Sequence, residues 1–192
     1  MLKDLVLKNR SYRKFHADRI VSAELLKSLV DLARNTPSSK NLQPLKYILV
    51  HDKPVSDRVF SSLGWARHLK DWNGPSVEER PPAYLIMLLD KSVSSEADTD
   101  AGIAAQTILL GATELGLGGC IIRTVKRDDL MNFFGLHEKF KILLVIAIGY
   151  PNQKITLTTV PESGSTNYFE KDGIHYVPKR NTEDIIIDPV VL

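Results

Sequence analysis

Apolar residues recur at helical spacing in several segments of the chain. They predict a short opening helix over residues 2–6 and longer helices over residues 22–35, 55–63, 100–115 and 127–134. The helix over 100–115 carries apolar residues on all sides, so we expect it to be central and buried. The pattern therefore favours a fold in which several helices surround one core.

Cap residues set the expected helix ends. Ser22 is placed to cap the second helix, and Asp98 or Thr99 is placed to cap the central helix. Gly116 is expected to end the central helix, because glycine adopts the left-handed conformation at little cost.

Two apolar runs of seven residues, 83–89 and 142–148, predict buried strands. They are much shorter than the roughly 20 residues needed to span a bilayer. Residues 47–50 and 120–122 predict shorter strands. Residues 64–82 hold two tryptophans, several prolines and glycines, and no clear period, so we expect an irregular and functional loop there.

After Pro151 the sequence becomes polar with isolated apolar residues, and it ends in Asp184-Ile185-Ile186-Ile187-Asp188. A β-rich tail of this kind must pair with a sheet edge, its own or a partner's. This pattern hints at a dimer.

Composition narrows the function. The chain has 192 residues with 25 Lys plus Arg against 23 Asp plus Glu, a net charge of +2, and its basic residues are scattered. This length predicts one domain, and this charge pattern argues against a nucleic-acid partner. The single cysteine, Cys120, excludes an intramolecular disulfide and a zinc site of several thiolates. The N-terminus lacks the apolar core of a signal peptide, so we expect a cytoplasmic protein without a membrane anchor.

Several common chemistries lack their motif. The sequence has no phosphate-binding GxxxxGK[ST] loop, no GxSxG nucleophile elbow and no HExxH pair. Its five histidines show no ligand spacing, so we expect no metal site. These features disfavour a hydrolase or a metalloenzyme.

Four polar clusters remain as candidate chemistry. They are RSYRK (10–14), PSSKNLQP (37–44), GLGGCIIR (116–123) and PKRN (178–181). Arginine forks suit phosphate or carbonyl groups, loop amides suit the edge of a heterocycle, and glycines permit close approach of a ligand. Each cluster also has a plain structural interpretation, as a basic turn, a serine turn, a tight helix-to-strand turn or a charged surface.

These clusters, in this order and together with the strand ending AIGYP, resemble the nitroreductase-like family of flavin mononucleotide (FMN) enzymes. The resemblance extends from about Leu5 to Ile187. It is closest to short members with a WARHLKDWNGP-type segment, here Trp65–Pro75.

The resemblance implies an α+β sandwich with a mixed, mainly antiparallel sheet flanked by helices, forming a single domain over residues 1–192. It also implies an interlocked homodimer in which the C-terminal segment pairs with the partner and FMN lies at the interface.

The resemblance also implies a set of FMN ligands. They are Arg10, Ser11 and Arg13 of the N-terminal motif, Ser38, Ser39, Asn41 and Gln43 of a loop that often comes from the partner subunit, the main chain of Gly119, Cys120, Ile121 and Ile122, and the phosphate ligands Lys179 and Arg180. The sequence departs from many members at Asn9, where they have arginine, and at Leu45, where they have tryptophan.

The implied activity is ping-pong transfer of hydride from NADH or NADPH to FMN and then to a nitroaromatic, a quinone or another small oxidised acceptor. The flavin carries this chemistry, and Arg13 is expected to tune it electrostatically. Trp65, Trp72 and Arg123 are candidates for the substrate side, although both tryptophans also fit core or dimer packing. Cys120 fits a small buried residue or a redox thiol. The alternative function is a non-catalytic flavin carrier or sensor.

Overall fold

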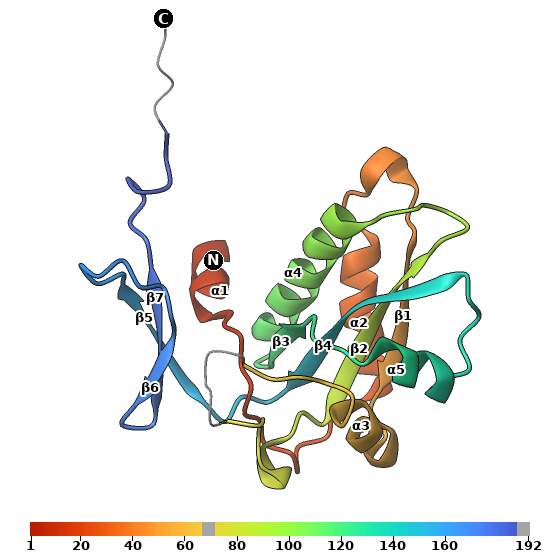
Figure 1. Ribbon diagram of the computed structural model, residues 1–192, viewed down its shortest axis with the longest axis horizontal. Coiled ribbons are helices and arrows are strands. Elements are labelled where there is room, and N and C mark those ends of the chain that lie inside the picture. Colours follow the sequence, from red (N-terminus) through yellow and green to blue (C-terminus); the bar gives the residue numbers. More distant parts are fainter. Residues whose placement is uncertain (67–71, 188–192) are drawn as a thin grey trace, which may run out of the picture. The chain divides into compact units, whose positions relative to one another are not determined.

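The computed structural model describes residues 1–66 and 72–187. The chain divides into two compact units (Figure 1). The first comprises Met1–Trp65 and Asn73–Asn152, and the second comprises Ala66–Trp72 and Gln153–Leu192. The expectation that residues 1–192 form a single domain stays a prediction.

A four-stranded sheet forms the centre of the first unit. Its strands are β1 (Leu45–Val50), β2 (Ala83–Asp90), β3 (Gly118–Ile122) and β4 (Phe140–Gly149), and their order is β1-β2-β4-β3. All three neighbouring pairs are antiparallel. The sequence predicted each strand, but β1, β3 and β4 all begin two residues earlier than expected. Every residue of β2 is buried, as expected of a strand that is covered on both faces.

Helices α2 (Ala23–Arg34) and α4 (Asp98–Glu114) form the main core with one face of this sheet. Leu26 and Leu29 of α2 pack there with Ile108 of α4 and with Leu85 and Met87 of β2. Alternate residues of a strand face opposite sides, so the neighbouring residues of β2 face the other side of the sheet.

Helix α3 (Lys53–Phe60) contacts β2, and Val59 is its most buried side chain. The predicted range of 55–63 for this helix is corrected, because the Asp52 side chain accepts a hydrogen bond from the Val55 N–H (3.3 Å) and starts the helix earlier. Helix α5 (Arg127–Phe133) matches its prediction.

The central helix begins differently from the expectation. Asp98 and Thr99 lie inside α4, and neither caps it; Ala97 occupies the cap position without a side-chain hydrogen bond. The other two cap predictions are confirmed. Ser22 accepts a hydrogen bond from the Leu25 N–H (3.2 Å), and Gly116 has a φ of +74° directly after the helix.

The remaining elements of the first unit are short. They are the helix α1 (Leu2–Lys8) and the 3-10 turns η1 (Ser39–Asn41) and η2 (Val77–Glu79). Residues 67–71, within the segment predicted to be irregular, lie outside the described residues.

The second unit holds its own three-stranded sheet. Strand β7 (Ile174–Lys179) lies between β5 (Lys154–Thr159), to which it is parallel, and β6 (Phe169–Lys171), to which it is antiparallel. The tail is therefore β-rich and pairs with strands of its own. Ile185, Ile186 and Ile187 follow this sheet and are exposed outside any strand. Their pairing with a partner subunit stays a prediction.

No helix among the described residues is both long enough and apolar enough to cross a membrane. The expected cytoplasmic location stays a prediction.

Candidate functional site

The end of α1 is fixed to the C-terminal half of α4. Asn9 is buried, and its side-chain amide donates hydrogen bonds to the Leu109 carbonyl (3.0 Å) and to the Thr113 hydroxyl (3.1 Å). From there the chain runs beside β3. Ser11 forms a parallel bridge with Gly119, and the Tyr12 N–H donates to the Gly119 carbonyl (3.0 Å). The structure thus brings the N-terminal motif and the glycine-rich strand together, although they are about a hundred residues apart.

Arg10 and Arg13 flank Ser11 and Tyr12 along the chain. Arg10 donates from Nη2 to the Val6 carbonyl (2.6 Å), and its buried Nε has no hydrogen-bond partner among the described residues. Arg13 lies near Cys120. Burial raises the pKa of the Cys120 thiol, and the Arg13 guanidinium opposes this by favouring the thiolate. Cys120 is therefore a small buried side chain beside a cation. This agrees with the first of its two expected roles, that of a small buried residue.

The glycines of β3 are needed for packing within the protein. A Cβ on Gly118 would lie 2.5 Å from the Tyr12 ring, and a Cβ on Gly119 would lie 2.5 Å from the Ala147 carbonyl oxygen. Real Cβ atoms do not approach neighbours so closely. The glycine run is thus explained by the tight turn at Gly116 and by close packing, without a ligand.

The second predicted cluster forms a loop held by a residue that the sequence analysis missed. The Ser38 hydroxyl donates to Asp100 Oδ2 (2.5 Å), and the Ser39 N–H donates to Asp100 Oδ1 (3.1 Å). The Gln43 N–H in turn donates to the Ser38 hydroxyl (2.9 Å). Asp100 lies in the first turn of α4 and is buried. The only signal for it in the sequence is an acidic residue near the start of a helix, which is common.

The loop backbone is unusual. Lys40, Asn41 and Gln43 have φ values of +50°, +56° and +53°, a region that non-glycine residues rarely adopt. The Gln43 side-chain amide donates to the carbonyl and the side-chain oxygen of Asn41 (3.1 and 3.2 Å), and both residues are exposed. The loop therefore presents two amides to the surroundings on a strained backbone.

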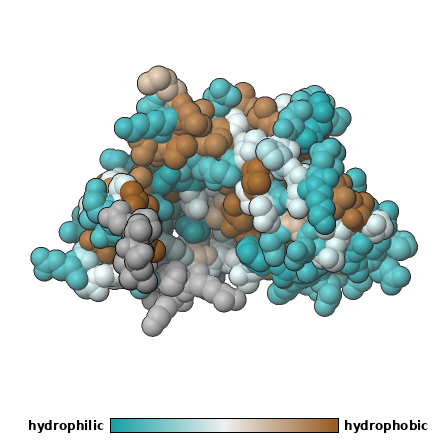
Figure 2. Space-filling view, turned by 90° about the horizontal axis from the view of Figure 1, so that it is seen from above, coloured by the Kyte–Doolittle hydropathy of each residue, from teal (hydrophilic) through white to brown (hydrophobic). Residues whose placement is uncertain are grey.

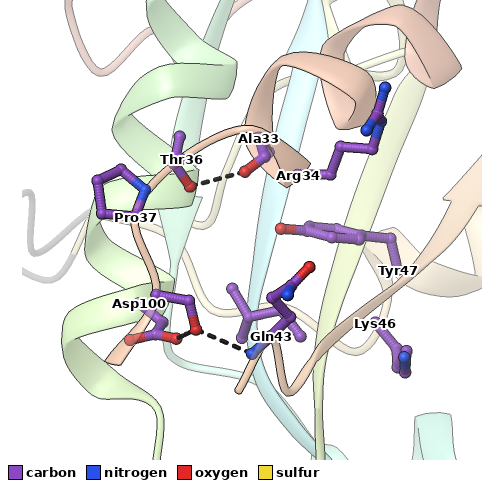
Figure 3. Close-up of a pocket in the computed structure, with 10 residues that line it drawn as sticks. Ala33, Arg34, Thr36, Pro37, Gln43, Lys46, Tyr47 and Asp100 are labelled. Atoms are coloured by element: carbon purple, nitrogen blue, oxygen red, sulfur yellow. Dashed lines mark hydrogen bonds between the residues drawn. The ribbon is translucent and has the colours of Figure 1, made fainter. Parts of the chain in front are cut away.

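A cavity of about 240 Å³ adjoins this loop (Figure 3). Its wall is formed by the end of α2, the loop, the start of β1 and Asp100, and it includes Leu45, the position at which many family members have tryptophan. Tyr47 projects across the cavity in Figure 3, and burial raises the pKa of its hydroxyl to about 12.

The two clusters lie at opposite ends of α4. The loop is bound at Asp100, whereas the N-terminal motif is bound through Asn9 at Leu109 and Thr113. At a rise of 1.5 Å per residue, these attachment points are about 14 to 20 Å apart along the helix axis. Figure 1 shows the same arrangement, with the loop near one end of α4 and β3 near the other. Within one chain, the predicted FMN ligands of the first unit therefore do not all lie in one place.

The other candidate residues have separate environments. Trp65 is only 9% exposed, its ring lies 5.6 Å from that of Phe60, and Gly74 packs against it. This favours its interpretation as a packing residue. Trp72 is half-buried, and residues 67–71, which separate it from Trp65, lie outside those described. Arg123 is exposed, and its carbonyl accepts a hydrogen bond from Arg127.

Lys179 and Arg180 belong to the second unit, where they are exposed at the end of β7. In the described part of the chain, no group of three His, Cys, Asp or Glu side chains is suited to hold a metal ion.

Comparison with known protein families identifies the fold. The profile described as "Nitroreductase family" matches residues 6–150, which is most of the chain. The chain belongs to the nitroreductase family. Its membership makes it an oxidoreductase, and the predicted α+β fold is confirmed.

Relatives agree with this assignment. A protein of Methanothermobacter thermautotrophicus, provisionally named an NADH dehydrogenase/NAD(P)H nitroreductase, is 27% identical over 173 residues, covering 86% of this chain and 81% of its own length. An iodotyrosine deiodinase of Thermotoga neapolitana is 23% identical over 170 residues, covering 79% and 89% respectively.

Solved structures share the fold. An FMN-dependent nitroreductase from Clostridium difficile R20291 is 27% identical, with a TM-score of 0.64 over 78% of this chain and 87% of that one. A nitroreductase family protein from Streptococcus pneumoniae TIGR4 is 16% identical, with a TM-score of 0.71 over 98% of this chain and all of that one.

Proposed function

We propose that this nitroreductase family member is an FMN-dependent NAD(P)H oxidoreductase that works as a homodimer and reduces a small oxidised acceptor. The observation that carries this proposal is the pairing of the basic N-terminal motif with the outer edge of β3, where a planar polar ligand has main-chain groups and cations within reach.

The residues at this edge fit a flavin. Strand β3 is the last strand of its sheet and pairs with β4 on one side. On its other side, the described residues provide the bridge from Ser11 to Gly119 and no backbone partner for Cys120 or Ile121. The isoalloxazine ring offers both hydrogen-bond donors and acceptors at its edge, so main-chain groups of β3 suit it. The unpartnered Nε of Arg10 is a further donor at this place.

The side chains take defined roles in this proposal. Arg10, Lys179 and Arg180 would neutralise the phosphate, which carries close to two negative charges. Arg13 would lie where negative charge develops on the reduced ring and would stabilise it. When bound, FMN supplies the hydride transfer between NADH or NADPH and the acceptor.

The position of the Ser38–Gln43 loop supports a dimeric site. Because the loop is bound at the far end of α4 from β3, its amides are better placed to serve a flavin held by a partner subunit. Helix α1 supports the same conclusion. It has no buried residue, and Leu2 and Leu7 are 68% and 50% exposed. An isolated helix this short is marginal in water, so a covering surface is expected. Figure 2 shows hydrophobic side chains gathered in patches on the face that it draws.

Names of relatives support the reductant and the acceptor class. Proteins named NAD(P)H nitroreductase, a deiodinase and an FMN-dependent nitroreductase are all similar to this chain. We accordingly propose NADH or NADPH as reductant and a nitroaromatic, a quinone or another small oxidised compound as acceptor.

The alternative of a flavin carrier or sensor would be favoured by a decayed site. Asn9, which stands where many family members have arginine, could be a sign of such decay, but its buried amide holds α1 to α4. Its change therefore has a structural explanation and is no evidence of decay.

The test uses the purified protein. We expect a yellow protein whose absorbance near the flavin band bleaches when NADH or NADPH is added without oxygen and returns when an acceptor is added. A yellow protein that neither nucleotide bleaches would support the carrier. A colourless protein that binds no added FMN would overturn both functions.

A further inference from the structure

Asp100 has the geometry of a clamp on the loop from Ser38 to Gln43. Its side chain is buried, with 5% of the residue exposed, and each carboxylate oxygen accepts one hydrogen bond from the loop. One bond comes from the Ser38 hydroxyl and the other from the Ser39 N–H. Because these partners are consecutive residues, the carboxylate fixes both the position and the direction of the chain as it leaves Pro37.

The clamp also closes the far end of the loop. The Ser38 hydroxyl directs its hydrogen towards Asp100 Oδ2, because its other partner, the Gln43 N–H, can only donate. A lone pair of that hydroxyl is then directed to the Gln43 N–H, which lies 2.9 Å away. Asp100 thereby holds residue 43 through residue 38.

The conformation that this network holds is one the loop would not keep by itself. Lys40, Asn41 and Gln43 all have positive φ, and a non-glycine residue in this region is strained. Such strain persists only where surrounding contacts impose it. The exposed amides of Asn41 and Gln43, which the proposed function assigns to flavin binding, are presented by these strained residues.

We infer that Asp100 is a positioning residue for the flavin site. It touches no flavin atom in this scheme, but it keeps the loop in the conformation that binds. This inference rests on the proposed function for the ligand, whereas the clamp itself can be tested without FMN. If Asp100 is lost, only a minor fraction of the protein keeps the binding-competent loop. The apparent affinity for FMN then falls in proportion to that fraction.

The main test compares Asp100→Asn with Asp90→Asn. Asparagine would direct an N–H towards Ser38 and reverse the polarity of that hydroxyl. Asp90 is a matched control, because it is also 5% exposed and accepts hydrogen bonds from a serine hydroxyl and a backbone N–H, in this case both from Ser92. We expect Asp100→Asn to raise the FMN dissociation constant, measured by quenching of flavin fluorescence, by about tenfold or more. We expect Asp90→Asn to change it less than twofold.

Trypsin cleavage after Lys40 reports on the loop without FMN. We expect the apoprotein of Asp100→Asn to be cut there faster than wild type or Asp90→Asn, and we expect saturating FMN to slow the cut. Equal cleavage rates together with equal FMN affinities in Asp100→Asn and wild type would overturn the inference.

Ser38→Ala keeps the test decisive if Asp100→Asn does not fold. It removes the hydroxyl that links Asp100 to Gln43 and leaves the carboxylate bound to the Ser39 N–H. We expect faster cleavage after Lys40 and weaker FMN binding in this variant too. Where both variants fold, the double variant should be no weaker than the worse single one, because both act through one network. Additive losses would mean that Asp100 acts by general destabilisation and would overturn the inference. A wild-type protein that binds no FMN would instead refute the proposed function, while the cleavage test would still decide whether the clamp exists.

Discussion

Burial explains why Asn9 stands where many family members have arginine. Its amide satisfies two acceptors on α4. We predict that Asn9→Ala lowers the free energy of unfolding by about 1–3 kcal/mol, because buried polar groups lose their partner. In a chain of this size that corresponds to a melting temperature lower by roughly 2–4 °C per kcal/mol. Asn35→Ala is the control, since the exposed Asn35 amide makes a single bond to the Asp31 carbonyl. Equal melting temperatures of the two variants would contradict this role of Asn9.

Arg13 is expected to affect the reduction potential of the bound flavin more than the affinity for FMN. We predict that Arg13→Ala lowers the midpoint potential of the bound flavin by on the order of 30 mV, which is about 1.4 kcal/mol for a two-electron couple. It should slow reduction by NADH or NADPH more than it raises the FMN dissociation constant. Arg34→Ala serves as the control, because Arg34 is exposed and pairs with Asp31 on α2. Spectroelectrochemistry decides the matter, and an unchanged potential would remove Arg13 from the tuning role.

Tyr84 gives a prediction for high pH. Its side chain is fully buried, its hydroxyl has no hydrogen-bond partner among the described residues, and burial raises its pKa. Above pH 10 the unfolded state loses this proton while the folded state keeps it, so the free energy of unfolding falls as pH rises. The slope for one such group approaches 1.4 kcal/mol per pH unit.

Tyr84→Phe should therefore reduce the loss of stability above pH 10, and near pH 7 it should be neutral or stabilising by about 1 kcal/mol. Urea unfolding of both proteins at pH 7 and pH 10.5 provides the measurement. An identical decline in wild type and Tyr84→Phe would show that Tyr84 does not remain protonated in the folded state.

At the scale of elements, apolar periodicity predicted most helices and both long strands, because burial of a regular face leaves a regular pattern. What it missed depends on side-chain contacts between distant residues. Asp100 and Ser38 are 62 positions apart, and their hydrogen bond leaves no local pattern. Likewise the early start of α3 depends on one capping hydrogen bond from the Val55 N–H to Asp52, which apolar spacing does not record.

Strand β3 provides a prediction at this scale, because at Gly118 and Gly119 it lies so close to its neighbours that only glycine fits. A Cβ on Gly119 would meet the Ala147 carbonyl oxygen and the Leu109 side chain at 2.5 and 2.6 Å. We predict that Gly119→Ala destabilises the fold by about 1–3 kcal/mol, since β3 must move away from β4 and α4. Gly102→Ala is the control inside α4, where a Cβ meets no atom within 4 Å. It should stabilise the fold by about 0.5–1 kcal/mol through helix propensity. Chemical denaturation of both variants tests the contrast, which fails if Gly119→Ala is as stable as wild type.

For the whole molecule, the sequence motifs indicated one flavin site but not where its parts lie. The N-terminal motif and β3 are together at one end of α4, and the Ser38–Gln43 loop is at the other. No periodicity predicts this, since the separation results from the length and direction of α4 in the folded chain. If both parts serve one flavin, as we propose, the site must be built from two subunits, and this leads to a test with mixed subunits.

Two defects placed in different chains should restore one site. Let one chain carry Arg10→Ala and Arg13→Ala, and let the other carry Asn41→Gly and Gln43→Gly, which remove the loop amides while glycine accepts the positive φ. If each site combines the N-terminal motif of one subunit with the loop of the other, the heterodimer has one site with both defects and one intact site. We therefore predict one FMN of wild-type affinity per heterodimer, purified through two different tags, and weak binding by either mutant homodimer. If each subunit built its site alone, both sites of the heterodimer would be defective and no tight FMN would bind, so the bound flavin per heterodimer distinguishes the two arrangements.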